Sequence, residues 1–356
     1  MHQVLVSASS GDAITNFALE VRDLMRRLGP SEIFARHIDP LVAGDVHELR
    51  RYDGWEPPST TNVVIYHASI GNPDVSAFLC ERRERLVLMY HNISPPESFA
   101  PYEPTFAALL EAGRADLVRL RDKVDLAIAV SAYNASDLVA LGYADVRVAP
   151  LIVDPDALHR TTRDDDTRRH LEAHVHGPMA LFVGQLLPHK RPELLIEAMH
   201  AVATYLIPET HLVLVGPRRI PRFASAVQRQ IVELGLANAW ITGAVTAGQL
   251  RAYYERADVF VTASDHEGFC VPLLEAMSFD VPVVARGTSA IPETLGDAGI
   301  MLDPDDGPLV MAEAWARVVT DRAVRDALVK EGRARVAEFR PERSRERLLD
   351  QLAGVL

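Results

Sequence analysis

The stretch that most constrains the fold of this chain is residues 257–285, ADVFVTASDHEGFCVPLLEAMSFDVPVVA. Its two ends, 257–264 and 281–285, are apolar and rich in β-branched residues, which predicts strands that are buried on both faces. Pro272 stands where the first turn of a helix accepts proline, and the leucines and methionine after it give that helix one apolar face. A strand, a helix and a strand in this order predict a parallel βαβ unit.

Two acidic residues lie at the turn of this unit. Glu267 follows the first strand, and Glu275 lies on the helix, on the side away from its apolar face. Ligands of open parallel sheets bind at the carboxyl ends of the strands, so we expect both carboxylates at one cleft. The simpler interpretation is that one is a loop acid and the other a glutamate favoured by the helix dipole.

Strands and helices alternate along the rest of the chain as well, which predicts an α/β fold with doubly wound parallel sheets. A length of 356 residues suits two domains, and 48% hydrophobic residues suffice for two cores. The polar segment 154–177 predicts a linker. We expect one domain at 1–170 and a second at 171–338. A helix is expected over 309–339, followed by a final helix within 339–356.

Composition and charge exclude several classes of protein. A net charge of −12 argues against a nucleic-acid binder, which needs a positive surface. Cys80 and Cys270 are the only cysteines, so neither a disulfide framework nor a zinc cluster is indicated. No apolar run reaches the roughly 18 residues that span a bilayer, and the first residues are too short and polar for a signal peptide. We expect a cytoplasmic protein, at most in peripheral contact with the inner membrane surface.

Two charged groups have a simple and a functional interpretation. The arginines 82, 83, 85, 114, 119 and 121 suit an anionic lipid or an acidic acceptor, but a solvated helix face is the more ordinary explanation. The aspartates 164–166 suggest a metal site, but consecutive residues of a flexible segment do not easily converge on one ion, so a solvated charge run is expected.

Further candidate residues follow other predicted strands. Gly184 and Gln185 end the strand ALFVG, and Lys190 precedes the helix that begins near Pro192, where a cation and free backbone amides together suit phosphate. Gly11 lies in the turn after the first strand, where it either exposes backbone amides to a ligand or is a plain connection.

Two histidines, His67 and His91, each follow an apolar strand of the first half. A histidine in this position is ordinarily structural and hydrogen-bonded to the backbone, and that is the interpretation we give His67. The polar loop after His91, extended by two prolines, is expected to place the ring of His91 over a cleft.

An ordered series of motifs resembles the retaining nucleotide-sugar glycosyltransferases of family 4, the glycogen-synthase-like group 1 glycosyltransferases. The resemblance is dense in the second half and thinner in the first. The second half carries VGQLLPHKRPELLIEA, LVLVGP, ITGAVTAGQLRAYYERADVFVTAS, EGFCVPLLE and AIPETLGDAG, and the first half carries GDAI, YHNISPP, VSAYNASDL and APLIVD.

The resemblance implies the GT-B fold, in which two Rossmann-like domains face each other across a cleft and the last helix returns to the first domain. The first domain would bind the acceptor and the second the nucleotide sugar. Glu275 would bind the ribose, Glu267 the transferred sugar and Lys190 the diphosphate, while His91 would contact sugar and diphosphate. The donor would also meet Gly184, Gln185 and the amides of Gly268, Phe269, Cys270 and Val271.

The implied reaction moves a sugar from a UDP-, GDP- or TDP-sugar to a hydroxyl acceptor, possibly a saccharide or a lipid-linked one, with retention of the anomeric configuration and without a metal or other cofactor. The family commonly has arginine where this chain has Gln185, so stabilisation of the leaving group would rest more on Lys190 and backbone dipoles, or on Arg191. Cys270, where glycine is frequent, is interpreted as a packing residue. A nucleotide-sugar epimerase and a non-catalytic nucleotide-sugar binder remain as alternatives.

Overall fold

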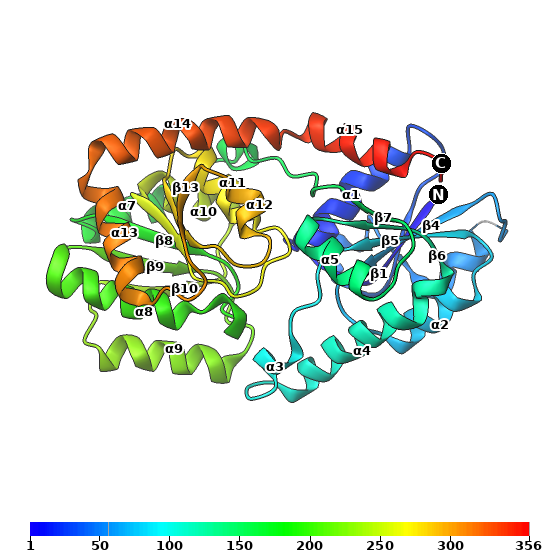
Figure 1. The fold of residues 1–356 in the computed structure, drawn as a ribbon, viewed down its shortest axis with the longest axis horizontal. Coiled ribbons are helices and arrows are strands. Elements are labelled where there is room, and N and C mark those ends of the chain that lie inside the picture. The colour runs from blue at the N-terminus through cyan, green and yellow to red at the C-terminus, as the bar shows by residue number, and fades with distance from the viewer. Residues whose placement is uncertain (56, 356) are drawn as a thin grey trace. The chain divides into compact units, whose positions relative to one another are not determined.

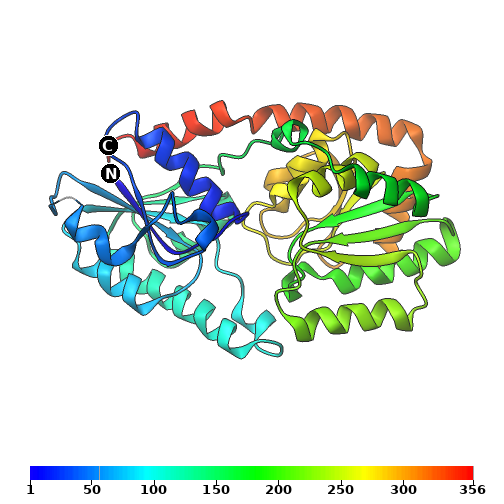
Figure 2. The ribbon, with the colours of Figure 1, turned by 180° about the vertical axis from the view of Figure 1, so that it is seen from behind.

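A computed structural model of the chain describes residues 1–55 and 57–355. It consists of two compact units, of which the second is Asp154–Arg340 and the first combines residues 1–153 with the last helix of the chain. Each unit is a parallel sheet covered by helices on both faces (Figures 1 and 2). The predicted fold class, two Rossmann-like doubly wound units with the last helix returning to the first, is confirmed.

The first unit has a seven-stranded sheet in the order β3-β2-β1-β4-β5-β6-β7. All of its pairings are parallel. The strands are β1 (His2–Ala8), β2 (Ile33–Ile38), β3 (His47–Glu48), β4 (Val63–Ala68), β5 (Arg85–Tyr90), β6 (Val124–Ala129) and β7 (Val146–Val148). Most of their apolar side chains are buried, as expected for a sheet with helices on both faces.

The helices of this unit are α1 (Ala13–Met25), α2 (Pro73–Glu81), α3 (Pro96–Phe99), α4 (Pro104–Leu120), α5 (Ala132–Ala140) and α15 (Pro341–Leu352). Arg345 of α15 forms an ion pair of 2.6 Å with Glu20 of α1, and Arg147 donates hydrogen bonds of 2.5 and 3.1 Å to the carbonyl oxygens of Gln351 and Ala353. These contacts hold the last helix on the first unit. The prediction extended this helix to Leu356, which lies outside the described residues.

The second unit has a six-stranded parallel sheet in the order β10-β9-β8-β11-β12-β13. Its strands are β8 (Met179–Val183), β9 (His211–Val215), β10 (Ala239–Gly243), β11 (Val259–Thr262), β12 (Val283–Arg286) and β13 (Gly299–Leu302). Its helices are α6 (Ala157–Arg160), α7 (Asp165–His174), α8 (Pro192–Ala201), α9 (Pro221–Glu233), α10 (Ala247–Arg256), α11 (Val271–Ser278), α12 (Ile291–Leu295), α13 (Pro308–Thr320) and α14 (Arg322–Glu338).

The predicted linker over 154–177 is wrong, because this segment forms α6 and α7 and packs on the second unit. Asp164 begins α7 by accepting a hydrogen bond of 2.7 Å from the amide of Thr167. Arg251 of α10 donates to the carbonyl oxygens of His159 and Thr161 at 2.7 and 2.8 Å. The boundary therefore falls after Val153 and not near residue 170.

Two further differences are local. The helix expected over 309–339 is divided into α13 and α14, because Asp321 adopts an extended conformation and its carboxylate accepts hydrogen bonds from the amides of Ala323 and Val324. Strand β2, with the sequence IFARHI, was not predicted, since only its first half is a run of buried apolar residues.

Candidate active site

The candidate site of the second unit lies where strands β8 and β11 are neighbours. From β8 the chain runs outward to β9 and β10, and from β11 it runs the other way to β12 and β13. A parallel sheet opens a crevice at the carboxyl ends of the two strands where its direction reverses. The loops after β8 and β11, residues 184–191 and 263–270, carry Lys190 and Glu267 to this edge.

Lys190 and Glu267 are in direct contact. The ammonium group of Lys190 donates a hydrogen bond of 2.6 Å to Oε1 of Glu267, and their side chains are only 19% and 9% exposed. The loops are joined by a hydrogen bond of 2.8 Å from the amide of Asp265 to the carbonyl oxygen of His189. The amide of Glu267 donates to Oγ of Ser289 at 2.8 Å. A cation and a carboxylate are thus fixed side by side.

A second ion cluster centred on Asp265 lies in the same loops. Its two carboxylate oxygens accept hydrogen bonds from Arg191 at 2.8 Å and from Arg286 at 2.6 Å. Arg191 is also paired with Glu193. The guanidinium of Arg191 is therefore engaged by two carboxylates, so Lys190 is the better candidate for a cation that meets a ligand.

The loop that carries Gln185 lies tightly against the end of β9. A side chain at Gly216, which has φ of +148°, would come within 1.9 Å of the carbonyl oxygen of Gly184. The amide of Leu186 donates to the carbonyl oxygen of Pro217 at 3.0 Å. Only glycine permits this close approach of two backbones, which fixes Gly184 and Gln185 at the carboxyl edge of the sheet.

The amino end of α11 also faces this edge. Cys270 precedes the helix in the left-handed conformation with φ of 68°, and its side chain does not cap the helix. Within residues 1–55 and 57–355, we find no hydrogen-bond acceptor for the amides of Gly268, Phe269 and Cys270. The orphan amides at the start of a helix suit an anionic or hydroxyl-rich ligand. The side chain of Phe269 is buried against Phe339, so Phe269 offers only its backbone.

The thiol of Cys270 is buried, and burial, followed by the charge of Glu267, raises its pKa well above the ordinary value. A thiol with a raised pKa remains protonated and is a poor nucleophile. This agrees with the interpretation of Cys270 as a packing residue.

Glu275 lies half-buried on α11 and is held by a tyrosine that the sequence did not single out. The hydroxyl of Tyr254, on α10, donates a hydrogen bond of 2.8 Å to Oε2 of Glu275. Burial raises the pKa of the Glu275 carboxyl, and the hydrogen bond from Tyr254 offsets part of this increase. Tyr254 orients one carboxylate oxygen and leaves Oε1 to accept hydrogen bonds from a ligand.

The remaining candidates belong to the first unit. Gly11, with φ of +74°, forms the exposed turn between β1 and α1, a backbone conformation that favours glycine. His91 follows β5, and its Nε2 lies 2.8 Å from Nδ1 of His67 at the end of β4. Nε2 of His67 lies 2.7 Å from Oε1 of Gln3 on β1. His67 is hydrogen-bonded to side chains and not to the backbone, contrary to its interpretation from the sequence.

Three residues missed by the sequence reasoning thus support the candidate residues. Tyr254 precedes Glu275 by 21 residues and Ser289 follows Glu267 by 22, and neither spacing has any local periodicity that would reveal the contact. Gln3 is a polar residue next to the apolar run Val4–Val6 of β1, and its polarity was the available signal.

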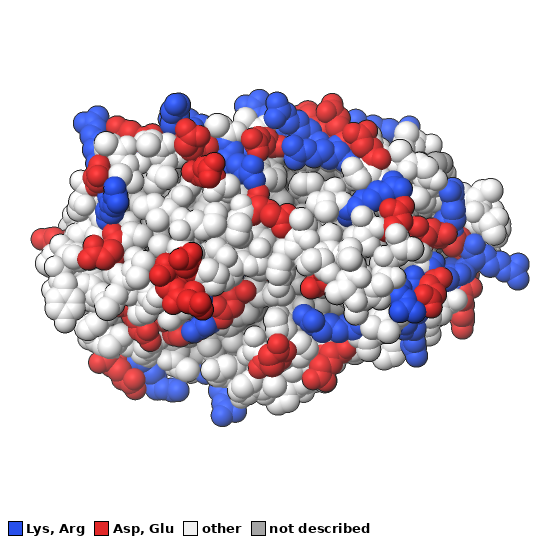
Figure 3. Space-filling model, viewed as in Figure 1, with Lys and Arg blue, Asp and Glu red and all other residues white. Residues whose placement is uncertain are grey.

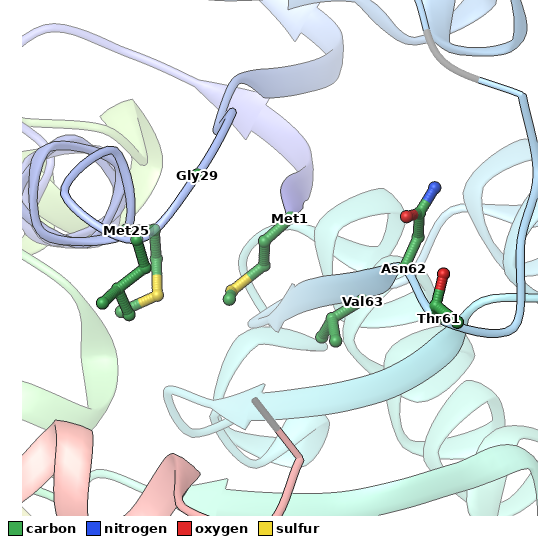
Figure 4. Close-up of a pocket in the computed structure, with 7 residues that line it drawn as sticks. Met1, Met25, Gly29, Thr61, Asn62 and Val63 are labelled. Carbon is green, nitrogen blue, oxygen red and sulfur yellow. The ribbon is translucent and has the colours of Figure 1, made fainter.

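Other features of the surface are less suited to a ligand. Met1, Met25 and Val63 line a small hollow of the first unit (Figure 4), but it lies at the amino ends of β1 and β4, away from the edge where ligands of parallel sheets bind. Asp164 caps α7, and Asp165 and Asp166 form ion pairs with Arg168 and Arg169. No group of three potential metal-binding side chains occurs within the described part of the chain.

Several arginines of the predicted arginine surface have partners in the first unit. Arg82 forms an ion pair with Asp53, Arg121 with Asp122, and Arg114 donates to the carbonyl oxygen of Ile93. Acidic and basic side chains are interspersed over the face drawn in Figure 3. Among the helices that the structure describes, none has the length and apolar character to cross a membrane.

Comparison with known proteins places this geometry in a family. Residues 164–335 match the family model of the group 1 glycosyl transferases. O-antigen chain mannosyltransferase B of Escherichia coli is 29% identical over 279 residues, which cover 74% of this chain and 69% of that protein. A GDP-mannose-dependent phosphatidylinositol monomannoside mannosyltransferase of Mycolicibacterium smegmatis is 30% identical over 214 residues, 56% of this chain and 54% of that protein.

Solved structures of low sequence identity share the fold over nearly the whole chain. Sucrose-phosphate synthase from Thermosynechococcus elongatus has a TM-score of 0.75 at 18% identity, with 98% of both chains covered. HepE from Anabaena, solved in complex with UDP and glucose, has a TM-score of 0.75 at 16% identity and 99% coverage of both chains. WaaG, a glycosyltransferase of lipopolysaccharide biosynthesis, has a TM-score of 0.74 at 13% identity, covering 99% of this chain and 100% of WaaG. Residues 164–335 belong to the group 1 glycosyl transferase family, and the chain has the GT-B fold that its motifs predicted.

Proposed function

We propose that this chain is a retaining glycosyltransferase of family 4 that transfers a sugar from a nucleoside-diphosphate sugar to a hydroxyl acceptor. The observation that carries the proposal is the contact between Lys190 and Glu267 at the reversal of the second sheet, beside the open amino end of α11. A diphosphate needs a cation and backbone amides, and a sugar needs a carboxylate that accepts from its hydroxyls.

In the proposed reaction, the bond between the anomeric carbon and the diphosphate oxygen breaks, and the nucleoside diphosphate leaves with the electron pair. The acceptor oxygen forms its bond to the anomeric carbon on the same face, and its proton passes to the leaving diphosphate. Lys190 and the amides of residues 268–271 would stabilise the charge on the leaving group. Glu267 would hold the sugar, and Glu275, oriented by Tyr254, would bind the ribose.

The ion pair between Lys190 and Glu267 balances the charge of the candidate site. Glu267 neutralises Lys190, so the entering diphosphate must share the ammonium group with the carboxylate or displace it. Gln185 adds a hydrogen-bonding side chain without charge. Lys190 is therefore the cation that the donor would meet, in competition with Glu267, while Arg191 and Arg286 remain paired with Asp265.

The names of the similar proteins suggest which donors and acceptors to test first. Two are mannosyltransferases, one of them GDP-mannose-dependent, and the acceptor in that name is a phosphatidylinositol mannoside. HepE was solved with UDP-glucose. We propose that GDP-mannose and UDP-glucose are the first donors to test, with TDP-glucose as the third, and that a saccharide or lipid-linked hydroxyl is the acceptor at the cytoplasmic surface of a membrane.

The test begins with a thermal-unfolding screen against GDP, UDP and TDP and their sugars, since a ligand that binds only the folded state raises its melting temperature. The stabilising donor is then incubated with saccharide and lipid-linked acceptors, and NMR of the product reads the anomeric configuration. We expect release of nucleoside diphosphate and a product with the configuration of the donor.

Three outcomes would contradict the proposal. Conversion of the donor sugar in the absence of any acceptor would identify an epimerase. Binding without transfer or hydrolysis, with any acceptor, would identify a nucleotide-sugar binder. An inverted product would exclude the retaining reaction. The control is Lys190→Ala, which we expect to remain folded by circular dichroism and to lose donor use.

A further inference from the structure

A chain of hydrogen bonds crosses three neighbouring strands of the first unit, from Gln3 on β1 through His67 on β4 to His91 after β5. Gln3, His67 and His91 are 0%, 1% and 9% exposed. Three polar side chains in a sheet interior need an explanation, because buried polar groups are retained at a cost to stability.

In this series, the donor and acceptor of each hydrogen bond are determined by the hydrogen bond before it. The carbonyl oxygen of Ala18 only accepts, so the amide group of Gln3, 3.0 Å away, donates to it. Oε1 of Gln3 therefore faces His67 and accepts from its Nε2, at 2.7 Å. The two roles of Gln3 are fixed by a backbone atom of α1.

The same reasoning extends to the two rings. Burial lowers the pKa of His67 well below its ordinary value and that of His91 to about 3, so both imidazoles are neutral near neutral pH. A neutral imidazole carries one proton. Because His67 carries its proton on Nε2, its Nδ1 accepts a hydrogen bond from Nε2 of His91 at 2.8 Å. His91 then has no proton on Nδ1.

Nδ1 of His91 is left as an acceptor that has no partner among the described residues. A buried acceptor without a partner is uncommon in folded proteins and marks a position where a ligand or water completes the hydrogen bonding. A diphosphate at neutral pH offers only acceptor oxygens and cannot satisfy this atom. A sugar hydroxyl can.

We propose that Gln3 and His67 are positioning residues that hold His91 in one tautomer, with Nδ1 ready to accept a hydrogen bond from a hydroxyl group of the bound sugar. The inference rests on the proposed function for the identity of the ligand. The tautomer itself depends only on contacts within the first unit.

Nitrogen-15 NMR of the histidine side chains tests the tautomer directly in the full chain without substrate. The chain has 13 histidines, and His91→Gln identifies the resonance of His91 by its loss. We expect Nε2 of His91 to be protonated and Nδ1 to be bare. Protonation of Nδ1 in the wild-type protein would overturn the proposal whatever the variants do.

The role of the hydrogen bonds from Gln3 through His67 to His91 is tested by kinetics with the donor that the protein uses. His67→Leu removes the acceptor for His91, and we expect kcat/KM to fall about tenfold or more, with His91 divided between its tautomers. His67→Gln keeps one acceptor and one donor, and we expect it to recover activity to within about threefold. Equal loss in both variants would show that His67 acts only through the shape of its ring.

Phe17→Leu is the matched control, because Phe17 packs edge-on against both rings, at 5.9 and 5.3 Å between centroids, without joining the hydrogen bonds. We expect nearly normal activity and an unchanged tautomer.

If the wild-type protein uses no nucleotide sugar at all, the proposed function fails, while the tautomer measured in the free protein still decides whether the chain of hydrogen bonds exists. If turnover occurs and the resonance of Nδ1 does not move when the donor binds, the assignment of a sugar hydroxyl to this atom is wrong.

Discussion

Lys190 and Glu267 are 77 residues apart in the sequence, yet Nζ of the lysine lies 2.6 Å from Oε1 of the glutamate. They meet because the sheet of the second unit reverses direction between β8 and β11, which brings the loops after these strands to one edge. With both side chains largely buried, the pair is the charged centre of the proposed donor site.

Removal of Lys190 is expected to affect both stability and activity. Lys190→Met leaves the buried carboxylate of Glu267 without its partner, and we expect the free energy of unfolding to fall by about 1–3 kcal/mol. The rate of sugar transfer should fall about 100-fold or more, since the leaving diphosphate loses its cation. The double variant Lys190→Met/Glu267→Gln should regain stability but not activity. Recovery of both in the double variant would contradict a role of Lys190 in catalysis.

Tyr254→Phe isolates the orientation of Glu275. The loss of one hydrogen bond should lower the free energy of unfolding by about 1 kcal/mol. Because the hydrogen bond from Tyr254 lowers the pKa of Glu275, its loss raises that pKa further, and the acidic limb of the activity profile should move to higher pH. The measurement is kcat/KM for the donor against pH. Tyr253→Phe is a control one residue away, and an equal displacement of the profile in that variant would contradict the assignment.

Cys270 is expected to be chemically inert. Burial raises the pKa of its thiol, so a maleimide reagent at neutral pH should label the exposed Cys80 and leave Cys270 unmodified. Cys270→Ala should keep activity within about threefold, because the thiolate has no part in the reaction. Mass spectrometry of labelled peptides and donor kinetics check the two expectations, and an inactive but folded Cys270→Ala protein would restore the thiol as a candidate.

Asp164 should matter for folding and not for catalysis. Its carboxylate begins α7, and Asp164→Ala is expected to cost about 1 kcal/mol of unfolding free energy. Asp166→Ala is the matched control, because its ion pair with Arg169 is exposed and should contribute less than about 0.5 kcal/mol. Urea unfolding compares the two. If divalent cations raised the stability of the wild-type protein but not that of either variant, the result would instead favour a metal site at these aspartates.

The buried histidines predict that acid destabilises the protein. His91 has a folded-state pKa lowered from 6.5 to about 3, so below pH 6.5 the unfolded chain takes up a proton that the folded chain does not. The free energy of unfolding therefore falls as the pH falls from 6.5 towards 3, by about 1.4 kcal/mol per pH unit for each such histidine. His91→Gln should reduce this slope in urea unfolding measured across the same range. An unchanged slope would show that His91 is protonated in the folded state.

Local sequence was sufficient to predict most strands and the positions of the main candidate residues. The run 257–285 alone predicted β11, α11 and β12, because buried parallel strands are almost continuously apolar and Pro272 fits the first turn of a helix. The same reasoning failed over 154–177. There Asp164 caps α7, which packs on α10, and the polar composition of the segment concealed this helix.

The sequence by itself determined the alternation of strands and helices, the two Rossmann-like units and the glycosyltransferase family, because periodicity and motif order are local properties of the chain. Only the tertiary structure decided that Lys190 contacts Glu267, that Tyr254 holds Glu275, and that Gln3 and His67 fix the tautomer of His91. Each of these contacts joins residues from different strands or helices. Their distance depends on the order of strands in a sheet and on the packing of helices against it, which no spacing along the chain specifies.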